Sequence, residues 1–309
     1  MVICTGQTPE SADGSTHTMN TRKLRKRAKE ALFAVEQKLD RARSSGRNGH
    51  FSNFGEQEII TKYIDLLKIA EHDRTIVDIG AGDGIRKSNS YNLVLNGWKV
   101  LGIEYDSRNA AKLARAYRFF PDAFACRFKV SSSNINDLLR SYSIEKELGI
   151  LSLDIDGCDY WVLDSILSEF RPRLIVSEYN EKIPPPVRFV VNNVPDFTLR
   201  HHFFGYSLSK LKDLLSKYDY VLLEIEYNNV FLAPTEIARE LSIDIEHAYQ
   251  AGYVERPDRR GKFKANDNME LLHSLSPSES LEFLADFYSQ YMGQFQIDLD
   301  DRETEKKEL

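Results

Sequence analysis

The sequence predicts an α/β protein built on a doubly wound, mostly parallel seven-stranded sheet that ends in an antiparallel hairpin. Two observations support this prediction. Short apolar runs alternate with helical patterns along the middle of the chain, which is typical of a parallel sheet with helices on both faces. Residues 220–227 and 230–233 then form two strand patterns around Asn228-Asn229, which indicates a hairpin that closes the sheet.

Composition limits the class of protein. The chain has 309 residues, 28% of them charged, and a net charge of -6, which gives no overall attraction for nucleic acid phosphates. No apolar run approaches the roughly 20 residues of a membrane helix. Cys4, Cys126 and Cys158 lie too far apart for a zinc or disulfide framework. We expect a cytoplasmic protein with neither a membrane nor a nucleic acid as its partner.

The pattern divides the chain into four parts. Residues 1–20 are rich in Ser, Thr and Gly and predict a disordered leader. Residues 21–71 predict N-terminal helices, the first of them basic, and residues 72–234 the sheet domain. Residues 235–309 predict a helical extension. Its apolar face is expected to pack within the chain or form a homodimer, with a substrate cap as the alternative, and comprises Leu281, Phe283, Leu284, Phe287 and Tyr291.

The elements follow in order from local patterns. Apolar residues at helical spacing predict helices over residues 56–71 and 208–218. Short β-branched and apolar runs predict five strands before the hairpin, at residues 75–79, 100–104, 123–130, from 149 into a run of acids, and 174–180. The stretch 181–206 looks irregular, and its place after a strand at the ligand-binding edge predicts a substrate lid.

A glycine-rich loop follows the first strand, directly before an expected helix. Its residues are Gly80, Ala81, Gly82, Asp83 and Gly84. Glycines at alternate positions let the backbone turn sharply and let a ligand approach main-chain atoms without meeting a Cβ. The dinucleotide fingerprint needs a third small residue where this chain has Ile85, so a pyrophosphate is not expected.

The second strand ends in Glu104, about 20 residues beyond this loop. A carboxylate at the carboxyl end of such a strand can accept hydrogen bonds from both hydroxyls of a ribose. The loop and this acid together predict a site for a nucleoside that lacks a pyrophosphate.

The run from Val77 to Gly84, together with Glu104, resembles the class I S-adenosylmethionine (AdoMet)-dependent methyltransferases, which have a Rossmann-like fold. The resemblance implies AdoMet as cofactor, with the loop glycines close to it and Glu104 on its ribose. The residues implied in the cofactor site are Asp78, Gly80, Ala81, Gly82, Asp83, Gly84, Glu104 and the adjacent Tyr105. Ser131, in the loop after the third strand, is expected at the adenine, whereas Ser133 or Asn134 as an ordinary helix cap explains the same loop.

Polar side chains also follow the fourth and fifth strands. Asp154 and Asp156 end the fourth strand, and Glu178 and Asn180 end the fifth, at the edge where parallel sheets bind ligands. Asp154 is assigned to the cofactor. Asp156, Glu178 and Asn180 form an oxygen-ligand set that suits Mg²⁺. The alternative is a general base, either Asp156 or a histidine such as His202.

The run from Leu153 to Asp159, with Ser177 to Asn180, resembles the FkbM-type methyltransferases, and Ile155-Asp156-Gly157 with Tyr160 is similar to magnesium-dependent sugar O-methyltransferases. The metal-dependent enzymes carry consecutive aspartates where this chain has Glu178-Tyr179-Asn180. The resemblance implies methyl transfer to a hydroxyl of a sugar or another small natural-product acceptor. Two alternatives stay open: a methyltransferase for protein or nucleic acid, and an AdoMet-binding module without catalysis.

Overall fold

A computed structural model of the chain describes residues 49–194, 197 and 199–300, together with Lys23, Leu24, Arg27, Ala28, Ala31 and Val35. The chain divides into two compact units, residues 1–49 and 50–309. In the first unit Gly49 lies in a turn and the other six described residues are helical. The predicted leader and most of the basic helix lie outside the described residues. No helix in the described part is both long and apolar enough to cross a membrane.

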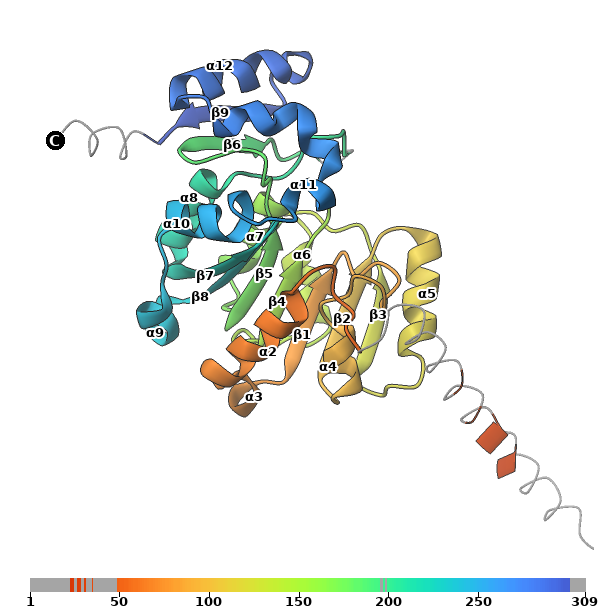
Figure 1. Cartoon of the computed structure of the whole chain (residues 1–309). Coiled ribbons are helices and arrows are strands. Elements are labelled where there is room, and N and C mark those ends of the chain that lie inside the picture. The colour runs from red at the N-terminus through yellow and green to blue at the C-terminus, as the bar shows by residue number, and fades with distance from the viewer. Residues whose placement is uncertain are drawn as a thin grey trace, which may run out of the picture. The chain divides into compact units, whose positions relative to one another are not determined.

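The second unit contains a seven-stranded sheet with the order β3-β2-β1-β4-β5-β8-β7 (Figure 1). The first five strands run parallel, and β8 lies antiparallel to both β5 and β7. The predicted fold class and the terminal hairpin are therefore confirmed. The strands are β1 (Thr75–Ile79), β2 (Lys99–Glu104), β3 (Ala123–Arg127), β4 (Ile150–Leu153), β5 (Leu174–Glu178), β7 (Tyr220–Glu226) and β8 (Asn229–Pro234).

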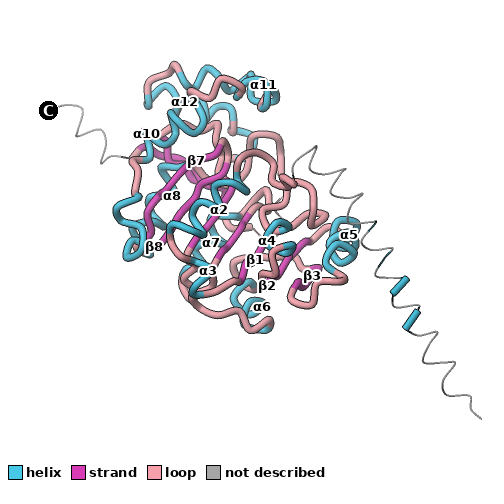
Figure 2. The backbone as a smooth tube through the Cα atoms, turned by 60° about the horizontal axis from the view of Figure 1, so that its bottom comes forward, coloured by secondary structure: helices cyan, strands magenta, loops and turns pink. Residues whose placement is uncertain are grey.

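Helices cover both faces of this sheet, and β1 shows how its sequence divides between them. Val77 and Ile79 pack into one core, whereas Ile76 packs into the other, because alternate residues of a strand point to opposite faces. One core contains residues of α6 (Ile135–Ser141), α7 (Asp159–Leu167), α8 (Leu208–Tyr218) and α10 (Ile245–Tyr249). The other contains residues of α2 (Glu56–Leu66), α3 (Ile69–His72), α4 (Tyr91–Leu95), α5 (Ser107–Tyr117) and α9 (Thr235–Ala238), and Figure 2 shows α2 and α3 over the strands.

Two predicted helices differ in outcome. The predicted helix 208–218 matches α8, which Ser207 caps by accepting the backbone N–H of Lys210 and which ends at Asp219 in the left-handed region. The predicted helix 56–71 is wrong as one element. Lys68 adopts a left-handed φ of 51° and separates α2 from α3.

A second sheet was not predicted. β6 (Val187–Val191) lies in the stretch that the sequence presents as irregular, and it pairs antiparallel with β9 (Phe295–Leu299) near the C-terminus. Figure 1 shows this pair beside α12 (Pro277–Phe287). The predicted apolar face of the extension packs here, since Leu284 is fully buried in a core with Phe189 and Phe203. The remaining elements are η1 (Arg239–Leu241), the π-helix η2 (Gln250–Val254), α11 (Arg259–Lys262), η3 (Lys264–His273) and η4 (Ser289–Tyr291).

Candidate active site

A cavity of about 840 Å³ lies at the carboxyl ends of β1, β2 and β4. Seven of the predicted site residues line it: Gly80, Gly82, Glu104, Tyr105, Ser131, Asp154 and Asp156. The other predicted residues do not line it: Asp78, Ala81, Asp83, Gly84, Glu178, Asn180 and His202. The structure therefore brings half of the predicted residues together at this cavity and places the other half outside it.

The three loop glycines are required for three different reasons. A Cβ at Gly80 would lie 1.6 Å from the carbonyl oxygen of Asp154, and a Cβ at Gly84 would lie 2.6 Å from Leu113 Cδ1. These two glycines permit close packing against the chain itself. Gly82 has a φ of 56° and open space where its Cβ would be. The sequence predicts that all three glycines leave room for a ligand. Of the three, only Gly82 has open space beside its Cα.

The predicted helix directly after Gly84 is wrong. Residues 85–90 form turns, and α4 begins only at Tyr91. Local hydrogen bonds explain the difference, since Asp83 Oδ1 accepts the backbone N–H groups of Ile85 and Arg86 at 3.1 and 2.8 Å. Partial burial opposes ionisation of Asp83, but these bonds and the Arg86 side chain lower its pKa overall. Asp83 thus shapes the loop from outside the cavity.

Glu104 and Gly82 lie together, as the sequence predicts. Glu104 Oε2 accepts the Gly82 N–H at 2.9 Å, and Oε1 accepts the Asp106 N–H at 2.6 Å. The carboxylate is held in place by the backbone on both sides. Because a carboxylate offers about four acceptor positions, it can still accept two further hydrogen bonds from a ligand in the cavity.

Asp78 and Ala81 support the loop from inside the protein. Asp78 is 5% exposed and points to the face of the sheet opposite Val77. Its Oδ2 accepts the Ser90 hydroxyl at 2.5 Å. Burial raises the pKa of Asp78, and the hydrogen bond from Ser90 opposes that shift. Ala81 is also buried in this core. Both residues therefore fix the loop rather than line the cavity.

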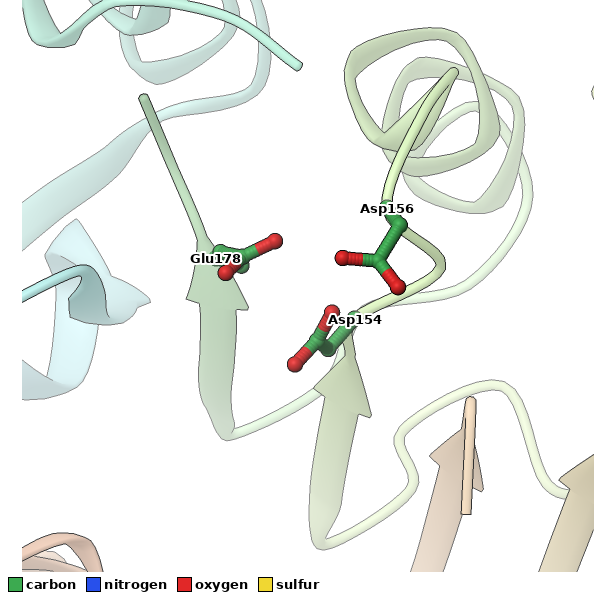
Figure 3. A group of neighbouring side chains, drawn as sticks. All are labelled: Asp154, Asp156 and Glu178. Atoms are coloured by element: carbon green, nitrogen blue, oxygen red, sulfur yellow. The ribbon is translucent and has the colours of Figure 1, made fainter. Parts of the chain in front are cut away.

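Three carboxylates form a cluster at the ends of β4 and β5. Oxygens of Asp154, Asp156 and Glu178 all lie within 4.8 Å of one another (Figure 3). Desolvation, followed by repulsion from Asp156 and Asp159, raises the pKa of Asp154 to about 7. Asp154 is exposed to the cavity, so water weakens the desolvation and the neighbouring charges matter correspondingly more. Burial and then Asp154 raise the pKa of Glu178 well above its usual range.

Glu178 has one oxygen without a donor among the described residues. Oε1 accepts the Asn228 side-chain amide at 2.7 Å, whereas the buried Oε2 has no hydrogen-bond partner. Two ionised carboxylates cannot hydrogen-bond to each other. A proton shared with Asp154, or a cation bound between the carboxylates, would satisfy this oxygen.

Asn180 and His202 lie elsewhere. Asn180 is fully buried, and its amide donates to the backbone oxygens of His202 and Phe204 at 2.9 and 3.0 Å. His202 is 3% exposed, lines a separate cavity of about 180 Å³ and bonds through Nε2 to Asn268 Oδ1 at 3.0 Å. Burial, then Lys182 and His201, lower its pKa to about 4. The prediction of His202 as the base is therefore corrected: it is a neutral packing residue.

Sequence reasoning missed two contributions to the site. Asn193, Val194 and Phe197 line the cavity from the segment after β6, and no local pattern places them there, because β6 pairs with the distant β9. Asp159 lies outside the cavity and accepts two backbone N–H groups of the loop after β4. Asp159 follows Asp154 and Asp156 and begins a predicted helix, a position at which an aspartate often accepts nearby backbone N–H groups. That position could have indicated its role.

No model of a protein family matches the sequence, and no curated protein matches it. Among solved structures, the chain is similar to magnesium protoporphyrin IX methyltransferase from Synechocystis with bound SAM (9% identity, 58% of this chain, 80% of that chain, TM-score 0.35). It is also similar to a putative O-methyltransferase from Klebsiella pneumoniae (13% identity, 63% of this chain, 86% of that chain, TM-score 0.39). A third similar structure is the O-methyltransferase from Bacillus cereus in complex with SAH (14% identity, 66% of this chain, 90% of that chain, TM-score 0.37). The strand order and terminal hairpin described above give this chain a Rossmann-like seven-stranded sheet.

Proposed function

We propose that this protein is an AdoMet-dependent methyltransferase. The observation that carries the proposal is the cavity of about 840 Å³ that Gly82 and Glu104, hydrogen-bonded to each other, both line. Its volume is within the range of about 300–1,000 Å³ that holds cofactors. The open space at Gly82 and the free acceptor positions of Glu104 both suit a nucleoside.

The lining residues suggest how the cofactor would lie. Glu104 would accept the two ribose hydroxyls, and Tyr105, Phe128 and Val130 offer apolar surface for the adenine. Ser131 closes that end of the cavity, and its N–H is held by Asn134 Oδ1 at 2.8 Å. The amino-acid end would extend toward Asp154, so the transferred methyl would face Asp156.

Asp156 is the proposed base. When bound, AdoMet supplies an electrophilic methyl group, so the protein has to align the acceptor and remove its proton. The Asp156 carboxylate would take the proton of the acceptor hydroxyl as the methyl group passes to that oxygen, with the methyl–sulfur bond of the cofactor breaking as the methyl–oxygen bond forms. The resemblance to FkbM-type and sugar methyltransferases supports a hydroxyl of a sugar or related small natural product as the acceptor. The spacing of the three cysteines supports the cytoplasm as the place of action.

As the alternative to a base at Asp156, we propose that Mg²⁺ binds at the carboxylate cluster. Asp154, Asp156 and Glu178 offer clustered oxygen ligands, and no described residue donates a hydrogen bond to Glu178 Oε2. Hard oxygen ligands suit Mg²⁺, which would lower the pKa of a bound hydroxyl. The set predicted from the sequence is Asp156, Glu178 and Asn180. In the structure Asp154 takes the place of Asn180, which is buried and donates to the backbone oxygen of His202.

Ligand-dependent thermal stability tests the proposed function. AdoMet at 100 times its Kd should stabilise the protein by about 2.7 kcal/mol, which raises Tm by roughly 5–10 °C. NAD should give no shift. Stabilisation by NAD alone would end the assignment. A screen of acceptors with labelled AdoMet then separates hydroxyl acceptors from protein or nucleic acid, and full activity in excess EDTA would remove Mg²⁺ from the proposal.

A further inference from the structure

We infer that Asp159 is a positioning residue that holds the Asp156 carboxylate toward the reacting group. The inference rests on the proposed function, which places the transferred methyl beside Asp156. Asp159 is the first residue of α7, is 1% exposed and does not line the cavity. It therefore touches no ligand in the cavity, and any effect on the reaction has to pass through its neighbours.

The contacts of Asp159 enclose Asp156. Its Oδ1 accepts the backbone N–H of Ile155 and its Oδ2 accepts that of Gly157, each at 2.8 Å. These two N–H groups belong to the residues on either side of Asp156. One buried carboxylate thus binds both ends of the short loop that presents Asp156 to the cavity.

Asp156 needs such a constraint because of its backbone. Its φ is 55°, in the left-handed region that residues with a Cβ seldom occupy without support from their surroundings. An unconstrained loop would relax toward negative φ and turn the side chain away. Figure 3 shows the carboxylate of Asp156 directed toward Asp154 and Glu178.

The other side of the loop is held independently of Asp159. The carbonyl oxygen of Gly157 accepts the Gly205 N–H at 3.0 Å. Phe197 packs so closely that a Cβ at Gly157 would lie 2.6 Å from its ring. These contacts fix the far end of the loop, so removing Asp159 should redirect Asp156 without displacing the whole segment.

Two cofactor analogues measure this placement without an acceptor. S-adenosylhomocysteine lacks the transferred methyl, whereas sinefungin carries an amine in the corresponding position. An ammonium group beside Asp156 should make sinefungin bind roughly tenfold more tightly than S-adenosylhomocysteine. The ratio of the two Kd values at pH 8, measured by calorimetry on the full chain, therefore reports where the carboxylate points.

Asp159→Asn keeps the size of the side chain but can accept only one of the two N–H groups. We expect the Kd ratio to fall toward one while the Kd for S-adenosylhomocysteine changes less than about threefold. The matched control is Asp164→Asn on the same helix, which removes the negative charge paired with Lys217 and should keep the ratio. If Asp159→Asn does not fold, Asp159→Ser also retains one acceptor and should likewise lower the ratio toward one.

A double-mutant cycle with Asp156→Asn decides between positioning and general support. If Asp159 acts through Asp156, adding Asp159→Asn to Asp156→Asn should leave the Kd ratio unchanged. If Asp159→Asn lowers the Kd ratio by the same factor in wild-type protein and in Asp156→Asn, the inference is overturned. A wild-type Kd ratio near one would overturn it as well. If wild-type protein binds neither analogue, it is the proposed function that fails.

Discussion

Asp156 joins a cavity-facing carboxylate to a left-handed backbone, and this makes Asp156→Asn an informative substitution. Asn tolerates the left-handed region better than most residues, so the variant should fold and bind S-adenosylhomocysteine, which lacks the sulfonium charge, with its affinity changed less than about threefold. Loss of the proton acceptor should lower turnover by about 10²–10⁴-fold. Labelled methyl transfer to the acceptor found by screening measures this effect. Turnover close to wild type would exclude Asp156 as the base.

His202 should make the protein sensitive to acid. Its folded pKa is about 4 against an ordinary 6.5, so below pH 6.5 the unfolded chain binds a proton that the folded chain does not. Stability is therefore full above pH 6.5 and is lost as pH falls toward 4. Relative to His202→Gln, the wild type should lose about 2 kcal/mol between pH 7 and pH 5.

Urea unfolding at both pH values measures that difference. His72→Gln, at an exposed position in α3, serves as the control and should follow the wild type. If the free energy of unfolding of His202→Gln changes between pH 7 and pH 5 as much as that of the wild type, the claim that His202 is buried as a neutral imidazole is contradicted.

The sequence predicted individual residues best where they follow a strand directly. Glu104 and Asp154 come immediately at or after strand ends and line the cavity. Asp78 lies inside a strand, and the alternation of side chains turns it to the opposite face from Val77. Asn180 lies two residues beyond β5, where the later course of the chain decides its direction. No local pattern contains that information.

At the scale of elements, two substitutions in the glycine-rich loop should affect stability and AdoMet affinity to different extents. Gly82→Ala meets open space but requires a φ of 56°, so it should cost about 1 kcal/mol of stability while weakening AdoMet binding, because its methyl enters the cavity. Gly84→Ala meets Leu113 and should cost more, typically about 1–3 kcal/mol, with less effect on affinity. Thermal unfolding and AdoMet titration of both variants give the comparison. Equal losses of affinity would contradict the separate roles.

Elements were predicted well where pattern and partner are both local. The strands β1 and β2 and the helix α8 follow from periodicity, and the terminal hairpin follows from two adjacent strands and a turn. The pairing of β6 with β9 joins Val187 to Leu299. Such a contact depends on the packing of Phe189, Phe203 and Leu284 in a shared core, which periodicity in either segment does not reveal.

At the scale of the whole second unit, the site depends on segments far apart in the sequence. Residues from Ile79 to Phe197 line the cavity. The segment that contributes Asn193 and Phe197 is anchored by the β6–β9 pair, and Asn192 bonds to the backbone oxygen of Gly293 at 2.8 Å. The C-terminal region therefore helps to shape the cavity from outside the main sheet.

The most direct test of the account is calorimetric titration of AdoMet into the full chain and into Glu104→Gln. The wild type should bind one AdoMet, and Glu104→Gln should bind at least about tenfold more weakly, because a charged acceptor for the ribose is lost. Glu145→Gln, at an exposed carboxylate outside the cavity, should match the wild type. Absence of binding, or equal affinity in Glu104→Gln and the wild type, would contradict the assignment of this cavity to AdoMet.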